Sequence, residues 1–185
     1  MTPTISILYN VAVNNPTILP LYNELSVEQA IIGLLRSYLK ANQYRADVFI
    51  HIMGVLAEVA CTAQSAEVLV RERFMAMWPG VTRMLGKGDD WEVLALQLKV
   101  VLRVLEANQG TLRKVVGDME DDGLVGWLMS IVGSVGKAKS YECYLNIFCQ
   151  ILTLPNLVTR CMTDQVALKV LAEVAKLSHS DEVSS

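Results

Sequence analysis

His51 is the residue best placed by its neighbours to support acid–base chemistry. It follows Asp47 by four residues and precedes Glu58 by seven, so the three share one face of a helix with Gly54. An imidazole between two carboxylates can form a pH-sensitive contact or an acid–base pair. No Ser or Cys nucleophile is identifiable from its spacing to His51. We therefore favour a groove-lining or locally paired histidine over a catalytic one.

The densest charge cluster is the sequence GDMEDDG at 117–123. A calcium-binding loop starting at Asp118 needs glycine at position 6, which this sequence has, and glutamate at position 12, where Met129 stands. Negative side chains are also favourable in the first turn of a helix. We therefore expect Asp121 and Asp122 to lie in the first turn of the helix that follows, with no calcium ion.

The cysteines do not form a metal-binding pattern. None of the four has CxxC spacing, and the only histidines that could join them are His51 and His179. We expect reduced thiols in or beside apolar helices of an intracellular protein. The cysteines are Cys61, Cys143, Cys149 and Cys161.

Two further motifs are short. The GKG at 86–88 lacks the rest of a phosphate-binding loop and is interpreted as a helix end and turn. Trp91 and Trp127 are expected to anchor the core. Trp78 precedes Pro79 and is expected to be partly exposed, which makes it a possible secondary binding contact.

Composition excludes several classes of function. The chain has 185 residues, 52% of them hydrophobic and 19% charged, and a net charge of −3. Without a basic cluster, nucleic-acid binding through phosphate neutralisation is not expected. Every apolar run is interrupted by a charge before it reaches membrane-spanning length, and the N-terminus lacks a signal peptide. Titratable groups are few and show no nucleophile–base or metal-ligand spacing, so we expect no enzyme, no cofactor and no metal.

Apolar residues at helical spacing, separated by short polar or Gly/Pro breaks, predict an all-α fold in four blocks. Each block contains a long apolar helix and two shorter ones, and a single domain covers 1–178, with a disordered tail at 179–185. Asn10, Glu58, Glu106 and Gln150 are equivalent points, separated by 48, 48 and 44 residues. The predicted repeats are approximately 1–40, 41–88, 89–136 and 137–178.

Individual helices are predicted from the same pattern. Ser26 is expected to cap a helix over 26–43, because serine is a favoured N-cap residue. The most apolar helix is predicted over 46–61, and the last one, over 163–178, carries a polar stripe suited to the end of a stack. The others are expected at 4–14, 16–25, 66–74, 79–88, 92–109, 110–120, 121–136, 140–154 and 155–162.

The sequence resembles the armadillo family, with HEAT repeats as the neighbouring possibility. The segment MWPGVTRML at 77–85 is similar to the second helix of an armadillo repeat. The segment ILYNVA at 7–12, followed by two asparagines, is similar to the long helix and the start of the next repeat. The resemblance implies a right-handed superhelix whose long helices line a concave groove. In armadillo proteins that bind extended peptides, a ladder of asparagines lines that groove, and only Asn10 matches it here.

This resemblance implies a protein-binding scaffold or adaptor that holds a partner peptide or helix on the concave face. The residues expected to line that face are Asn10, His51, Glu58, Lys99, Arg103, Glu106, Asn146 and Gln150. We expect a cytoplasmic location, with nuclear or cytoskeletal association left open. Residues 4–13 have almost no polar face, so we expect either the C-terminal part of a longer solenoid or a homo-oligomer formed through this helix.

Overall fold

The computed structural model describes residues 2–85, 91–163, 165, 168–170, 172, 173 and 176. Regular secondary structure in these residues is entirely helical, which confirms the predicted all-α class. The tail at 179–185, the turn at 86–88 and half of the polar helix predicted over 163–178 lie outside the described residues.

Four helices lie side by side and form what we call the first row. Helix α4 packs against α1 on one side and α7 on the other, and α7 also packs against α10. The first row consists of α1 (Thr2–Asn14), α4 (Ala46–Val59), α7 (Trp91–Ala107) and α10 (Tyr141–Ile151).

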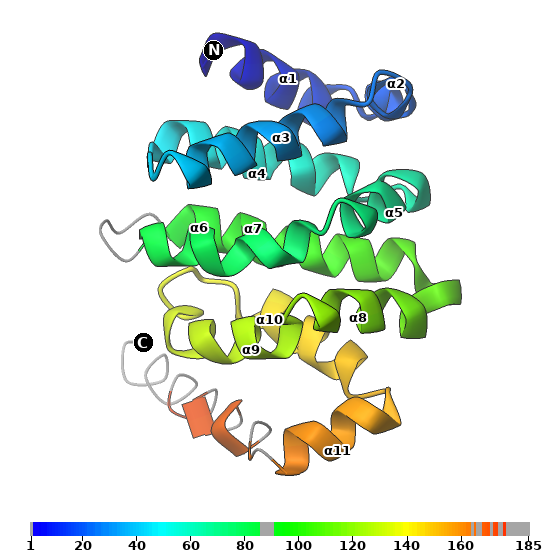
Figure 1. The fold of residues 1–185 in the computed structure, drawn as a ribbon, viewed down its shortest axis with the longest axis vertical. Coiled ribbons are helices and arrows are strands. Elements are labelled where there is room, and N and C mark those ends of the chain that lie inside the picture. The colour runs from blue at the N-terminus through cyan, green and yellow to red at the C-terminus, as the bar shows by residue number, and fades with distance from the viewer. Residues whose placement is uncertain are drawn as a thin grey trace, which may run out of the picture.

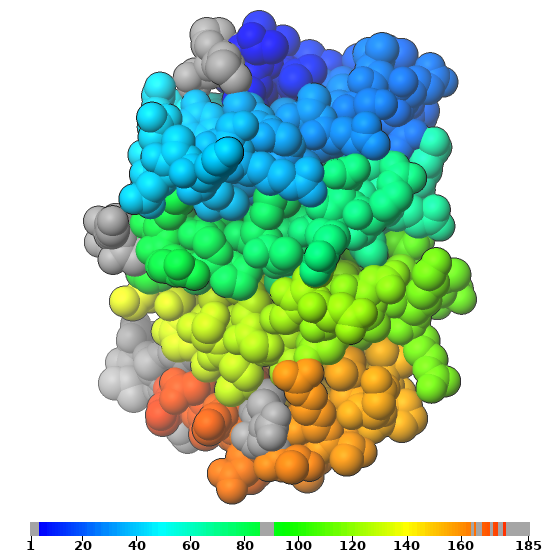
Figure 2. Space-filling model, viewed as in Figure 1, coloured from blue at the N-terminus to red at the C-terminus, as the bar shows by residue number. Residues whose placement is uncertain are grey.

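Further helices form a second row along the first (Figure 1). They are α2 (Leu19–Glu24), α3 (Val27–Lys40), α5 (Ala63–Arg71), α6 (Trp78–Leu85), α8 (Leu112–Asp121) and α9 (Leu124–Ile131), and α11 (Pro155–Thr163) follows α10. Single 3₁₀ turns join several of them: η1 (Pro16–Ile18), η2 (Phe74–Met77), η3 (Gln109–Thr111) and η4 (Val132–Ser134). The layers succeed one another along the longest axis and form bands of colour in the space-filling view (Figure 2).

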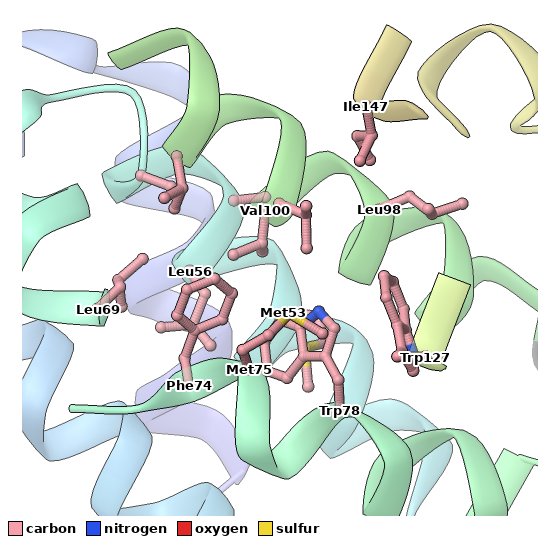
Figure 3. Packing of buried hydrophobic residues seen from close by; sticks show 14 of the residues in the cluster. Met53, Leu56, Leu69, Phe74, Met75, Trp78, Leu98, Val100, Trp127 and Ile147 are labelled. Atoms are coloured by element: carbon pink, nitrogen blue, oxygen red, sulfur yellow. The ribbon is translucent and has the colours of Figure 1, made fainter. Parts of the chain in front are cut away.

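The core lies between the two rows, because α4 and α7 are apolar on most sides. Trp78 of α6 is fully buried, its ring edge-to-face with Phe74 at 5.0 Å between centroids. Met53 of α4 and Trp127 of α9 lie in the same buried cluster (Figure 3). Burial of such apolar surface contributes about 25 cal/mol per Å² and makes this contact between rows the main source of stability.

A left-handed residue recurs where a short helix meets the next helix. Ser26, Arg73 and Gly123 have φ of 55°, 55° and 91°, and Gln165 follows with 55°. These residues recur at intervals of about 42–50, in the range of helical repeats. Ser26 is the N-cap residue of α3, as predicted, but its side chain makes no capping hydrogen bond. The turn before α3 is so tight that Ser26 must adopt a left-handed backbone instead.

The acidic cluster ends one helix rather than beginning the next. Helix α8 continues to Asp121, and Asp122 is its C-terminal cap residue, so the expected place of both in the first turn of α9 is wrong. The carboxylate that serves the start of α9 belongs to Glu120, which accepts a hydrogen bond of 2.8 Å from the Val125 amide. The reason is that buried Met119 extends the apolar face of α8 almost to the glycine that turns the chain.

Arginine–carboxylate pairs join successive layers at their edges. Arg36 Nη1 lies 3.2 Å from a Glu72 carboxylate oxygen. Arg73 Nε donates to Asp122 at 2.8 Å. Arg160 of α11 pairs with Glu120. Each pair connects helices that are far apart in sequence and fixes the register of neighbouring layers.

Candidate functional site

The four helices of the first row carry all eight residues predicted to line the binding face. Asn10 lies on α1, His51 and Glu58 on α4, and Asn146 and Gln150 on α10, while α7 carries Lys99, Arg103 and Glu106. Because these helices lie side by side, the eight residues follow one another across the row. Asn10, Glu106 and Asn146 are exposed, and the other five are partly buried.

Glu58 is the centre of the best-defined cluster. Its carboxylate accepts hydrogen bonds from Lys99 Nζ and Arg103 Nη1, both at 3.0 Å, and Arg103 also donates to the Ala57 carbonyl at 2.6 Å. Burial opposes ionisation of Glu58, but the two cations outweigh it, so the pKa of this carboxyl lies below its ordinary value. The cluster therefore holds one negative and two positive charges across the α4–α7 contact.

His51 is not part of an acid–base pair. Its Nδ1 lies 2.5 Å from the Asp47 backbone carbonyl, whereas the Asp47 carboxylate pairs with Arg45 at 2.7 Å. The His51 ring packs edge-to-face on Tyr9 of α1, with 5.7 Å between centroids. Since the Glu58 carboxylate points to α7, the arrangement supports the groove-lining interpretation of His51 and gives no base–nucleophile geometry.

The α7–α10 side of the site surrounds a half-buried thiol. Burial raises the pKa of Cys143 to about 11. The negative charge of Glu106 adds to this rise, whereas the positive charge of Lys99 opposes it. Gln109 Nε2 donates to Gln150 Oε1 at 2.9 Å across the same contact. The structure thus brings Lys99, Glu106 and Cys143 close together, a grouping that sequence spacing did not reveal.

Trp78 does not belong to the site. Its side chain is fully buried and its indole N–H donates to the Gln97 carbonyl at 3.4 Å, so the expected partial exposure is wrong. Proline at the second position of α6 allows the helix to begin at Trp78 itself, with the ring turned into the core. Trp127 is a core residue as predicted, whereas Trp91 is only partly buried, under the Lys137 ammonium at 4.9 Å.

The described residues contain no group of three or more metal-ligating side chains. Asp118 and Asp121 of the calcium-like sequence are exposed, while Asp122 is paired with Arg73. Within the part of the chain that the structure describes, no helix combines the length and the apolar character needed to span a membrane. No family model, curated protein or solved structure matches this chain.

Proposed function

We propose that this chain is a protein-interaction module built as a right-handed, armadillo/HEAT-like superhelix of about four repeats. Three features support this architecture: a first row of helices in contact one after another, a second row of helices along it, and left-handed turns at intervals of about 42–50 residues. In such a stack the exposed side of the first row is the concave face.

The partner is a protein segment or helix that lies across the first row. The observation that carries this proposal is the Glu58–Lys99–Arg103 cluster, in which charged groups of two neighbouring helices are held in place by hydrogen bonds to one another. Side chains already held in position lose little entropy when they bind. A net charge of −3 argues against nucleic acid as the partner, and we propose a non-enzymatic adaptor in the cytoplasm.

Site-specific photo-crosslinking in cells tests this proposal. A photoreactive amino acid is placed at Glu106 or at Asn146, both exposed on the first row, and at Lys40 or Arg83, both exposed on the second row. We expect one crosslinked partner from the first-row positions and none from the controls. Crosslinks from the second row alone contradict the proposal.

A charge exchange within the cluster provides the second half of the test. Glu58→Lys with Arg103→Glu keeps an opposite-charge pair across α4 and α7 but inverts the charge pattern presented to a partner. Helicity by circular dichroism is expected to stay unchanged, and the crosslink is expected to disappear. A crosslink of unchanged strength shows that the partner does not contact this cluster.

A second candidate function is self-association through the N-terminal end of the stack. Ile7 and Leu25 are 61% and 66% exposed, and Val13 and Leu21 are 44% exposed each. Large apolar side chains exposed together mark contact surfaces. Light scattering over a dilution series tests this alternative, because a dimer that Ile7→Lys with Leu25→Lys converts to a monomer supports it. A monomer at every concentration contradicts it.

A further inference from the structure

Three cavities follow one another along the side of the stack formed by the second row. The first, of about 280 Å³, lies between α3 and α5 and includes Glu28 and Arg71 in its lining. The second, of about 580 Å³, lies between α5 and α8. The third, of about 630 Å³, lies between the start of α8 and Leu154. Helices α2, α5 and α8 succeed one another along one edge of the fold (Figure 1).

The cavities are contiguous because neighbours share walls. Glu67 and Arg71 of α5 line both the first and the second cavity. Thr111 and Lys114 line both the second and the third. The three spaces therefore adjoin one another across three successive layers, and we call them together the edge groove.

Glu28 gives the first end of the edge groove a buried negative charge. The residue is 1% exposed, and its carboxylate accepts hydrogen bonds only from neutral groups, Asn23 Nδ2 at 3.2 Å and the Ser65 hydroxyl. Among the described residues, no Lys, Arg or His forms an ion pair with it. A buried carboxylate without a cation is costly, so a positive group from outside the chain would be stabilised here.

Comparison between repeats shows that packing does not require this charge. Counted from the left-handed residue of each repeat, the position of Glu28 is occupied by Met75 and by Val125, which are 1% and 4% exposed. The position of Ser65 is likewise occupied by Val115, which is 5% exposed. Glu28 and Ser65 are thus polar residues at two positions that are apolar in the other repeats compared. Such departures from the local packing pattern are expected at functional sites.

The far end of the edge groove has the opposite charge. Arg113 and Lys114 line the third cavity, both are exposed, and no carboxylate shares that lining with them. The lining of the second cavity contains both signs of charge, with Arg71 and Lys114 beside Asp118 and Asp121, and it includes the apolar Val70 and Val115. The groove therefore changes from anionic at Glu28, through a mixed middle, to cationic at Arg113.

We propose that the edge groove binds an extended segment of a partner protein that carries a basic side chain toward Glu28 and an acidic one toward Arg113 and Lys114. Packed helices lie about 8–10 Å apart, so the two ends are roughly 20 Å apart. An extended chain covers about 3.3 Å per residue, and the two charged side chains are then about six residues apart. This surface is separate from the first-row face.

Fluorescence anisotropy with synthetic peptides and the full chain tests the groove. The probe is a nine-residue, end-capped peptide of Ala, Ser and Thr with Lys at its second position and Glu at its eighth. We expect it to bind at least tenfold more tightly than a Glu/Glu peptide of the same spacing, and more tightly than a peptide of the same composition with Lys and Glu two residues apart. Equal binding of the three peptides, or binding of none, overturns the proposal.

A charge reversal makes the test specific to the cationic end. Arg113→Glu with Lys114→Glu changes two exposed side chains, and it is expected to reverse the preference so that a Lys/Lys peptide binds best. Lys114→Gln alone is expected to weaken the Lys/Glu probe several-fold if the double variant does not fold. Arg83→Glu, at an exposed position of α6 outside the three linings, is the matched control and is expected to leave all affinities unchanged. An unchanged ranking in the double variant shows that the probe binds elsewhere.

Discussion

At the scale of single residues, Glu58 links the candidate site to stability. Glu58→Gln removes the charge that Lys99 and Arg103 share, and we expect it to lower the free energy of unfolding at pH 7 by about 1 kcal/mol. The folded-state pKa of Glu58 is lowered from 4.5, so its contribution is present above that pH and is lost as the pH falls through the lowered value. Urea unfolding of both proteins between pH 7 and 3 measures the difference, which should shrink below pH 4.5.

The control for this prediction is Glu106→Gln on the neighbouring helix α7, which also carries Lys99 and Arg103. Glu106 is exposed and forms no ion pair with a described residue. Its variant is expected to keep the stability of the unmodified protein within about 0.5 kcal/mol. An equal loss in both variants would show that the chain's net charge, rather than the cluster, determines the effect.

The alkylation rate of the Cys143 thiol measures how well α7 and α10 enclose this side of the site. With a pKa of about 11, only about one thiol in a thousand is ionised at pH 8, and the thiolate is the reactive form. We expect iodoacetamide to modify Cys143 at least tenfold more slowly than the exposed Cys61 and Cys149, as measured by peptide mass spectrometry.

Glu106→Gln is expected to have the opposite effect on the alkylation rate of Cys143. A negative neighbour disfavours the thiolate, so removing the charge of Glu106 is expected to lower the pKa of Cys143 and to speed its alkylation. Cys149, which is exposed, should react as before. Alkylation of Cys143 as fast as that of Cys149 in the unmodified protein would show that α7 and α10 do not enclose this thiol.

At the scale of helices, Gly54 determines how closely α1 approaches α4. A Cβ atom at Gly54 would lie 2.4 Å from Tyr9 Cε2, so an alanine must push the Tyr9 ring away from α4 and from His51. We expect Gly54→Ala to lower the free energy of unfolding by about 1–3 kcal/mol, the usual cost of overpacking. Thermal or urea unfolding measures it.

Gly117→Ala is the matched control, because a Cβ at Gly117 of α8 meets nothing within 4 Å. Alanine is favoured over glycine within a helix, so this variant is expected to gain about 0.5–1 kcal/mol. If Gly54→Ala is also stabilising, then α1 does not pack on α4 through Tyr9.

The helices themselves could largely be predicted from sequence, because each depends on a local pattern. Helix α4 was predicted over 46–61 and covers Ala46–Val59, with its apolar residues buried as expected. The turns were less predictable: Ser26 has the residue type of a cap, but its backbone conformation is determined by how α2 must meet α3. Propensity describes a residue's own preference, and tertiary packing overrides it.

The contacts between helices were beyond the sequence. The eight predicted site residues lie on the four helices of the first row, and four of them, Asn10, Glu58, Glu106 and Gln150, are 48, 48 and 44 residues apart, as the repeat requires. Nothing in that spacing shows that Glu58 meets Lys99 and Arg103, or that the Glu28 carboxylate lies on Ser65, 37 residues away. Such pairs depend on the register between neighbouring layers, which only the packed core determines.

At the scale of the whole molecule, the order of the stack implies a gradient of local stability. Helices α4 and α7 each have neighbours on both sides in the first row and are buried over most of their length. Helix α1 packs on α4 alone within that row and leaves Ile7 and Val13 exposed. In a stack where each layer contacts only its neighbours, an end layer can open while the middle stays folded.

Hydrogen exchange measured by mass spectrometry tests this gradient. We expect the slowest amide exchange in α4 and α7, at rates set by global unfolding, and exchange in α1 faster by at least tenfold, because opening α1 breaks the contact with only one first-row helix. Gly54→Ala should accelerate exchange in α1 more than in α7, since it weakens the α1–α4 contact specifically. Equal exchange in α1 and α7 would mean that the layers unfold as one cooperative unit, and that an extended stack of separable repeats is the wrong description of this chain.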